Sequence, residues 1–390
     1  MSFSLPERVT LKGPNFIREV FERGVGVPGF ISFGIGNPAP EAIPVKVIED
    51  AFDFIVHENP MGLLQYGPMQ GDARLAELTL QRLSKVHHMN LEGQGLIISN
   101  GAGQLLGLVP ITVCEPGDEV YMDDYTFTSA INSVRNMGAK AVGIKTDEFG
   151  MIPSELEKVA QSGKGKYIYL IPNFQNPTGI TMPLERRKEI YAIASKYDLF
   201  IYEDDPYGEI RFAGEHVPTF KSFDTENSVL YAGSYSKTLS AGLRVGFLLG
   251  PEDVIGTIQA LKNNTAGQMP LVTQKVVAHV LDHIDYDVHL ENVRKVYKSK
   301  IEFINVITAP EIEMLIIIHK GMYSDYYKVK SHTNPSDFCK DRLKLSSVKS
   351  KEFIEDYFAD IDDLLSAIKK YKRLANIPKN EVCLADLLAE

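Results

Sequence analysis

The middle of the chain alternates short apolar segments, rich in β-branched and aromatic residues, with longer segments of helical period. Six strands are predicted, at residues 95–99, 118–124, 166–172, 199–204, 228–234 and 244–250. Helices are expected from Leu105, over 125–138 and over 182–198. Strands that alternate with helices form a largely parallel sheet, because each crossover places a helix on one of its faces. The pattern therefore predicts an α/β fold.

The length of 390 residues exceeds the size at which one hydrophobic core usually keeps growing, so we expect two domains. Helical period dominates after the last predicted strand, with a long helix expected around 285–307 and an amphipathic helix over 352–375. We predict a large α/β domain over 45–290 and a small α+β domain over 291–390, which residues 1–44 join.

Composition excludes several classes of protein. The formal net charge of −10 repels phosphate backbones, so nucleic acid is not an expected partner. No apolar run is long enough to span a membrane, and the first residues do not resemble a signal peptide. The three cysteines, Cys114, Cys339 and Cys383, are far apart and suit neither a disulfide framework nor a zinc cluster. We therefore expect a soluble, cytoplasmic protein.

Polar and glycine-rich segments follow the predicted strands, where ligands bind in open α/β sheets. "NGAGQLLG" (100–107) opens a helix, and its free backbone N–H groups suit an anion such as phosphate. The glycines there are equally explained by the bend alone. "NFQNPTGI" (173–180) has the composition of a turn, and taken alone it indicates nothing more.

Three acids stand together at another strand end, in "EDDPYGEIRF" (203–212). Like charges at close range oppose one another's ionisation, so the cluster needs a partner. That partner is a helix start or Arg211, a magnesium ion, or a protonated ring nitrogen facing Asp204. No second acidic cluster follows another strand, which disfavours the metal, and we predict no metal site.

Lys237 lies in the apolar segment "GSYSKTLSAGLRVGFLLG" (233–250), with Arg244 seven positions further on. The ordinary lysine pKa is about 10.4, whereas a nucleophilic lysine works best near a pKa of ~7–8. An apolar site with a neighbouring cation lowers the pKa in that direction. A lysine reaching out to solvent is the alternative. We predict that Lys237 binds a cofactor as an imine and that Arg244 helps to bind the cofactor's phosphate.

Taken together, "NPTG" (176–179), "EDDPYGEIRF" and "SYSKTLSAGLRVG" (234–246) resemble the fold-type I pyridoxal-phosphate (PLP) aminotransferases. The resemblance is closest to the aromatic and 2-aminoadipate aminotransferase branch, and "LLQYGPMQGDARLAE" (63–77) extends it. It implies a mostly parallel seven-stranded sheet sandwiched by helices, with a small α+β domain. It also implies a ping-pong reaction that moves the amino group of an α-amino acid to a 2-oxo acid.

The resemblance implies a role for each matching residue around the cofactor. Lys237 would form the internal aldimine and then shuttle the α-carbon proton, while Asp204 would keep the pyridine nitrogen protonated. Asn176 and Tyr207 would hydrogen-bond the ring's 3′ oxygen. The phosphate would be bound by Ser234, Ser236, Arg244 and the helix start at Ala102, Gly103 and Gln104.

Further roles concern the cofactor face and the substrate. Phe127 would stack on the cofactor ring, and Gly36 would lie in an N-terminal segment that closes over the substrate. Asn176 would also contact the substrate. Tyr66 would reach into the partner subunit's site, which implies a homodimer. Arg342, in "KDRLKLSS" (340–347), would bind the substrate's α-carboxylate, since its planar fork suits a bidentate contact.

The chain also departs from the family pattern. Ala102 and Gly103 replace a usual serine and glutamine, and residues 300–342 form a segment about half as long as usual. Three alternatives to transamination therefore stay open. They are a lyase or decarboxylase, a PLP-binding protein with little turnover, and a regulatory module. Regulators of this type carry a basic DNA-binding extension, which does not fit before residue 30.

Overall fold

The computed structural model describes residues 36–305. The chain divides into two compact units, and residues 32–296 all belong to the larger one. Most of the expected N-terminal segment (1–44) and small domain (291–390) lies outside the described residues, and so does the helix expected over 352–375. The expected domain limits therefore stay a prediction.

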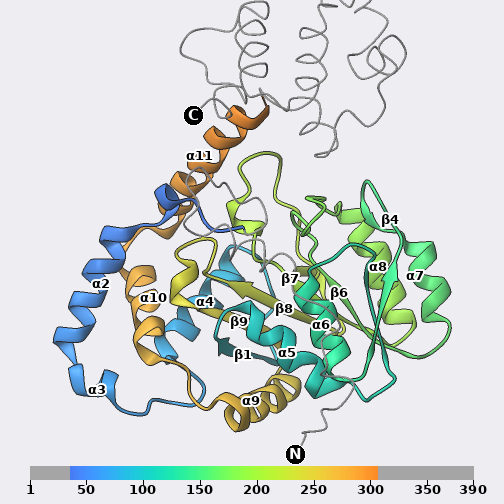
Figure 1. The fold of residues 1–390 in the computed structure, drawn as a ribbon, viewed down its shortest axis with the longest axis horizontal. Coiled ribbons are helices and arrows are strands. Elements are labelled where there is room, and N and C mark those ends of the chain that lie inside the picture. Colours follow the sequence, from blue (N-terminus) through green and yellow to red (C-terminus); the bar gives the residue numbers. More distant parts are fainter. Residues whose placement is uncertain (1–35, 306–390) are drawn as a thin grey trace, which may run out of the picture. The chain divides into compact units, whose positions relative to one another are not determined.

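Seven strands form one sheet in the described range, in the order β1-β9-β8-β7-β6-β2-β3 (Figure 1). They are β1 (Gln94–Ser99), β2 (Glu119–Asp123), β3 (Lys140–Ile144), β6 (Gly165–Leu170), β7 (Phe200–Asp204), β8 (Val229–Ser234) and β9 (Gly246–Pro251). All neighbours are parallel except β9, which runs antiparallel to both β1 and β8. The predicted mostly parallel, seven-stranded α/β sheet is confirmed.

The six predicted strands are present, but two features were not predicted. Strand β3 forms one edge of the sheet, and β4 (Thr146–Asp147) pairs with β5 (Gly150–Met151) in a separate two-stranded sheet. Most of β3 is only partly buried, so its sequence "KAVGI" lacks the continuous apolar run of the inner strands. An edge strand with so few buried apolar residues is hard to recognise from sequence.

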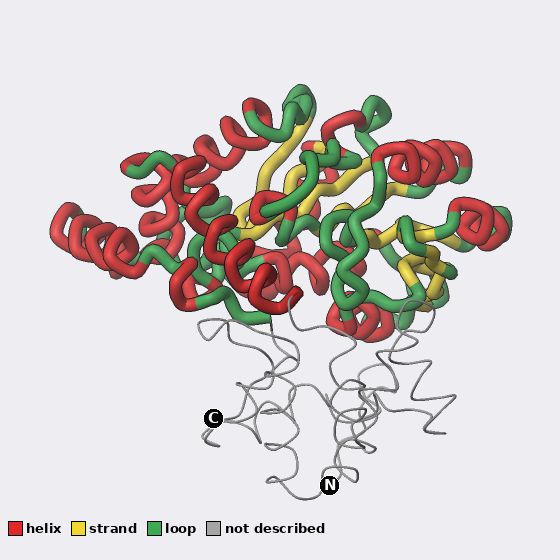
Figure 2. The backbone as a smooth tube through the Cα atoms, turned by 90° about the horizontal axis from the view of Figure 1, so that it is seen from above, coloured by secondary structure: helices red, strands yellow, loops and turns green. Residues whose placement is uncertain are grey.

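Helices lie on both sides of the sheet (Figures 1 and 2). One face is covered by α5 (Ala102–Val113), α6 (Thr128–Asn136) and α9 (Glu252–Ala266). The opposite face is covered by α2 (Val45–Glu58), α4 (Ala73–Lys85), α10 (Leu271–His283), α7 (Pro153–Ala160) and α8 (Leu184–Lys196). The helices predicted over 182–198 and 285–307 correspond to α8 and to α11 (Tyr286–Asn305).

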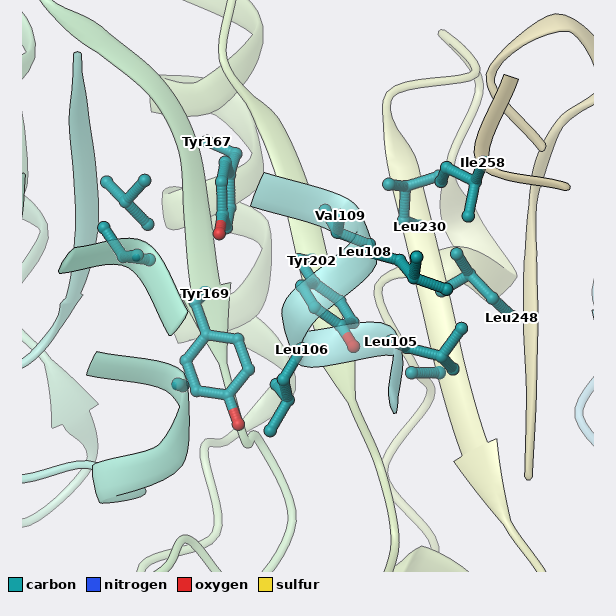
Figure 3. Close-up of a cluster of buried hydrophobic side chains, with 14 of the residues drawn as sticks. Leu105, Leu106, Leu108, Val109, Tyr167, Tyr169, Tyr202, Leu230, Leu248 and Ile258 are labelled. Carbon is teal, nitrogen blue, oxygen red and sulfur yellow. The ribbon is translucent and has the colours of Figure 1, made fainter. Parts of the chain in front are cut away.

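The core forms because successive residues of each strand point to opposite faces. Tyr169 and Leu230 belong to the cluster beneath α5, whereas their neighbours Leu170 and Tyr231 belong to clusters on the other face. Figure 3 shows the leucines of α5 beside the tyrosines and leucines of the strands. Burial on both faces makes the inner strands nearly continuous apolar runs, which is why the sequence revealed them.

The fold places the ends of five parallel strands at one edge of the sheet. These ends are Ser99, Asp123, Leu170, Asp204 and Ser234. Each of the polar segments noted in the sequence leaves the sheet at this edge. No helix in residues 36–305 is long and apolar enough to cross a membrane.

Candidate active site

Adjacent strands bring the two central candidates to the same place. Asp204 ends β7 and pairs with Ala232 of β8, and Lys237 follows β8 in the next turn. Ser234, the last residue of β8, pairs with Gly246, the first residue of β9. Lys237 and Arg244 therefore both lie in the connection between β8 and β9.

Asp204 is a buried carboxyl group, only 4% exposed. Its Oδ2 accepts a hydrogen bond from the Tyr169 hydroxyl at 2.7 Å. Its Oδ1 has no hydrogen-bond partner among the residues that the structure describes. The pKa of Asp204 is raised to about 6, mainly by burial and with a contribution from the neighbouring Asp205, while the Tyr169 hydrogen bond opposes the increase. A buried carboxylate oxygen without a partner is ready to accept a hydrogen bond from a bound ligand.

The other two acids of the cluster are fully occupied by the protein. Glu203 accepts hydrogen bonds from the backbone N–H groups of Phe220 and Lys221, both at 3.0 Å. Asp205 accepts from the Asn173 side chain at 3.0 Å, the Gly208 backbone at 2.9 Å and the Tyr231 hydroxyl at 3.2 Å. In the described range no group of three or more acidic, histidine or cysteine side chains is arranged to hold a metal ion.

Lys237 lies in the turn after β8, and its Nζ donates a hydrogen bond to the carbonyl oxygen of Gly36. Burial lowers the pKa of Lys237, and the positive charge of Arg244 lowers it further. The direction of this shift agrees with the sequence prediction. The structure thus places Gly36 beside the Lys237 amine.

A group of donors faces the start of α5. The guanidinium of Arg244 donates to the carbonyls of Asn100 at 3.3 Å and Ala241 at 3.4 Å. A Cβ on Gly101 would lie 2.5 Å from Arg244 Nη2, so a larger residue there would displace the guanidinium. Gly101 also has a φ of 71°, which favours glycine. Gly101, the residue before α5, has no side chain to cap the helix, and the Gln104 N–H donates to the Gly101 carbonyl at 3.2 Å, so the N–H groups of Ala102 and Gly103 are the ones available to an anion.

The remaining members of this donor group have internal contacts. Ser234 Oγ accepts from the Ser236 backbone at 3.1 Å and lies 3.4 Å from the Val245 carbonyl. Gln104 Oε1 accepts from the Asn100 backbone at 2.9 Å, and Ala102 and Gly103 form the first turn of α5. Gln104 thus closes the turn before the helix.

Burial raises the pKa of Tyr207 and the nearby Asp204 raises it further, whereas the neighbouring Asn176 side chain opposes the increase. Phe127 directly precedes α6 and packs half-buried against the same core cluster as Tyr207. These residues come from three different connections at the carboxyl edge. Their roles at the cofactor stay predictions.

One predicted residue lies away from this group, and another is outside the described range. Tyr66 lies on the surface between α3 (Pro60–Leu64) and α4, and it is 91% exposed. Arg342 lies outside the described residues. Both roles stay predictions.

Sequence analysis missed the side chains that hold the acids and the turn in place. Tyr169 donates to Asp204, and Arg187, which is fully buried, donates to Asn173 at 2.8 Å. Asn173 in turn contacts Asp205. The only signal was a hydroxyl-bearing or charged residue inside an otherwise apolar segment, which is typical of many core positions.

Comparison with known proteins identifies the family of this chain. The family model of the class I and II aminotransferases matches residues 28–322. An aromatic-amino-acid aminotransferase of Thermococcus litoralis is 29% identical over 73% of this chain and 69% of its own length. A 2-aminoadipate transaminase of Thermus thermophilus is 31% identical over 70% of this chain and 68% of its own length.

A solved structure shows the same likeness. The crystal structure of Pyrococcus horikoshii kynurenine aminotransferase, in complex with pyridoxamine phosphate (PMP) and kynurenine, superposes with a TM-score of 0.73 at 29% identity. The superposition covers 77% of this chain and 76% of that one. The family match spans well over half of the sequence. The chain therefore belongs to the class I and II aminotransferases and is a PLP-dependent transaminase.

Proposed function

We propose that the transamination takes place at the carboxyl edge of the sheet, with PLP bound between Lys237 and Asp204. The observation that carries this assignment is the buried, unpartnered Oδ1 of Asp204. A protonated ring nitrogen is a cationic N–H donor, and such a donor stabilises a carboxylate that burial otherwise disfavours. Of the three acids in this cluster, Asp204 alone keeps a free oxygen among the described residues.

Bound PLP supplies a ring that takes up electron density when the substrate's α-carbon loses its proton. The charge of Asp204 keeps the ring nitrogen protonated, which this chemistry needs. The neutral amine of Lys237 would take the proton from the substrate's α-carbon and carry it. Because only the neutral amine accepts a proton, the lowered pKa of Lys237 increases the active fraction at neutral pH.

The other site residues bind and orient the cofactor. Arg244 donates to the phosphate, since its always-charged guanidinium suits a phosphate dianion. The remaining phosphate contacts come from Ser234, Ser236 and the start of α5 at Ala102, Gly103 and Gln104. Asn176 and Tyr207 hydrogen-bond the ring oxygen, and Phe127 stacks on the ring face.

We propose an aromatic or 2-aminoadipate-like α-amino acid as the donor and a 2-oxo acid as the acceptor. The names of the two relatives and of the kynurenine enzyme support this class of donor. Gly36 and Asn176 contact the substrate in this proposal, and Arg342 binds its α-carboxylate.

We further propose a homodimer in which Tyr66 reaches into the partner's site. Large apolar side chains are exposed along the segment that leads to Tyr66, including Val45, Met61 and Leu64, the last 78% exposed. Contiguous exposed apolar residues mark interaction surfaces, because leaving them in water is unfavourable. A second copy of the chain would cover them.

We place the protein in the cytoplasm on the basis of its cysteines. They are few and widely separated, and Cys114 is a buried free thiol. Such usage is typical of reducing compartments.

The attachment site is tested by borohydride reduction of the yellow PLP-loaded protein, followed by peptide mass spectrometry. We expect the reduced cofactor on Lys237, and its loss in Lys237→Ala. Burial also lowers the pKa of Lys262, to about 8, so this lysine is the natural competitor. Lys262→Met is the matched control and should keep the adduct. An adduct on Lys262, or one that survives in Lys237→Ala, removes the assignment.

The substrate class is tested by half-reactions. Each of a panel of amino acids is added to the PLP form, and conversion to the pyridoxamine spectrum is followed. Aromatic and aminoadipate-like donors should react fastest. Release of ammonia or CO2 instead would favour the lyase alternative, and no spectral change with any donor would indicate a PLP-binding protein without turnover.

A further inference from the structure

The turn that carries Lys237 is held on both sides by side chains from outside the active-site motifs. Before Lys237, the hydroxyl of Tyr235 is 2.8 Å from Thr79 Oγ1 on α4. After Lys237, the carbonyl oxygen of Thr238 lies 2.6 Å from Nε2 of His289 on α11. Tyr235 and Thr238 are both buried, at 4% and 3% exposure. The two flanks of the reactive lysine are therefore attached to two different helices.

The contact with His289 has a defined direction. A carbonyl oxygen only accepts hydrogen bonds, so Nε2 of His289 must carry the hydrogen and donate it. The ring of His289 also lies against the buried ring of Tyr286, with centroids 5.9 Å apart. One turn further along α11, Arg294 Nε donates to the carbonyl of Glu209 at 2.9 Å. Glu209 follows Tyr207 by two residues, so α11 holds main-chain oxygens beside two site residues.

Tyr235 and Leu239 of this turn pack in a core cluster, and the hydrogen bonds add to that packing. Residues 235–239 are neither helix nor strand, and a small cavity lies against them, lined by Thr79, Tyr235 and Thr238 among others. Where atoms are missing on one side, dispersion contacts are lost there, and the hydrogen bonds carry more of the positioning. A lysine has a long flexible side chain, so the position of its backbone decides where the amine can reach.

We propose that His289 is a positioning residue for the reaction, which fixes the Thr238 carbonyl and thereby the orientation of Lys237. The inference rests on the proposed role of Lys237 as the cofactor-binding lysine. His289 touches neither substrate nor cofactor in this proposal. It acts through the backbone of the residue that follows the lysine.

Two amide substitutions test the proposal. In His289→Gln the side-chain N–H reaches about as far as Nε2, whereas in His289→Asn the same amide is one methylene too short. Val288→Asn places that amide on the exposed side of the same helix turn and controls for its effect on α11. PLP-loaded proteins are compared by thermal melting, by the pH midpoint of the cofactor's visible absorption, and by the rate of one half-reaction.

We expect His289→Asn to shift the pH midpoint of the cofactor's absorption by roughly half a pH unit or more. This midpoint is the pKa of the lysine–cofactor linkage, which depends on the surroundings of Lys237. We expect the half-reaction of His289→Asn to slow by about ten- to a hundredfold, as a misplacement near 1 Å can do. In His289→Gln the half-reaction rate should stay within about twofold of the wild-type rate, and the absorption midpoint within ~0.2 pH unit of the wild-type midpoint, because the amide reaches the Thr238 carbonyl. Val288→Asn should behave as the wild type.

The proposal is overturned if His289→Asn keeps the wild-type absorption midpoint and half-reaction rate. It is also overturned if His289→Asn and His289→Gln change both quantities by the same amount. A reduced melting temperature with an unchanged midpoint also overturns it, because that result indicates a structural role only. If the wild type itself forms no reducible adduct on Lys237, the proposed function fails instead, and the two failures are thereby distinguished.

Discussion

Replacing Asp204 by asparagine tests whether burial controls the electrostatics of the active site. The folded-state pKa of Asp204 is about 6, above its ordinary value of 3.8, because burial disfavours the charged form. The folded chain thus binds this proton more tightly than the unfolded chain does. The contribution of Asp204 to the free energy of unfolding is therefore fully present below its ordinary pKa and is lost as the pH rises through about 6. The shift corresponds to a total loss of about 3 kcal/mol.

The assay is urea unfolding of the cofactor-free wild type and Asp204→Asn at about pH 5 and about pH 7. Between these values a carboxyl with the pKa of Asp204 releases most of its proton, so the wild type should lose about 1.4 kcal/mol more than the variant. Burial also raises the pKa values of Glu203 and Asp123 to about 7, but both acids are present in both proteins and their effects cancel.

A second variant checks the sign. Tyr169→Phe removes the hydroxyl that stabilises the charged form of Asp204, so the pKa of Asp204 should rise and the loss of stability should move to higher pH. Saturating PLP should reduce the pH dependence of the wild type and leave that of Asp204→Asn unchanged. If wild type and Asp204→Asn lose the same stability between the two pH values, burial does not set the pKa of this carboxyl and the reasoning is wrong.

Three further predictions concern the surroundings of the site. Gly101→Ala should lower PLP affinity and destabilise the fold by about 1–3 kcal/mol, because the new Cβ meets Arg244 and the φ is positive. PLP titration and urea unfolding measure both effects, and wild-type values in both would contradict the expected collision. Burial lowers the pKa of Lys262 to about 8, so the wild type should gain up to about 1.4 kcal/mol per pH unit over Lys262→Met between about pH 8 and pH 10. Equal pH slopes in urea titrations would show that Lys262 is hydrated. Finally, mixing inactive Tyr66→Ala with inactive Lys237→Ala subunits should restore about a quarter of the wild-type activity, since half of randomly formed dimers are mixed and each contains one intact site. A mixture without activity would exclude a shared site.

The sequence predicted the inner part of the sheet well because burial on both faces leaves a continuous apolar run. It missed β3 because this edge strand is mostly half-exposed, and it missed the β4–β5 pair because two-residue strands have no readable period. The order of the strands could not be predicted from single segments. That order depends on which apolar faces fit together, which no individual segment contains.

The site was predicted as a set of residue types but not as a set of contacts. In "EDD" (203–205) the sequence shows three similar acids, and only the structure shows which oxygen keeps no partner in the described part of the chain. Glu203 and Asp205 are satisfied by Phe220, Asn173 and other groups distant in sequence. The contact of His289 with Thr238 was equally invisible, because it joins residues 51 positions apart.

The spacing of Lys237 and Arg244 follows from the direction of β9. A parallel strand after β8 would need a crossover of about a dozen residues or more, which would carry the chain away from the carboxyl edge. Because β9 is antiparallel and Gly246 pairs with Ser234, the connection stays at that edge and contains both cations. The backbone of Arg244 is left-handed, with a φ of 52°. Two residues further on, a Cβ on Gly246 would lie 2.7 Å from the backbone nitrogen of Ala102, so the chain passes close to the start of α5. This reversal therefore keeps the Lys237 amine near the Arg244 guanidinium, which lies against the start of α5, so a longer insertion between 237 and 244 should weaken phosphate binding before it affects the fold.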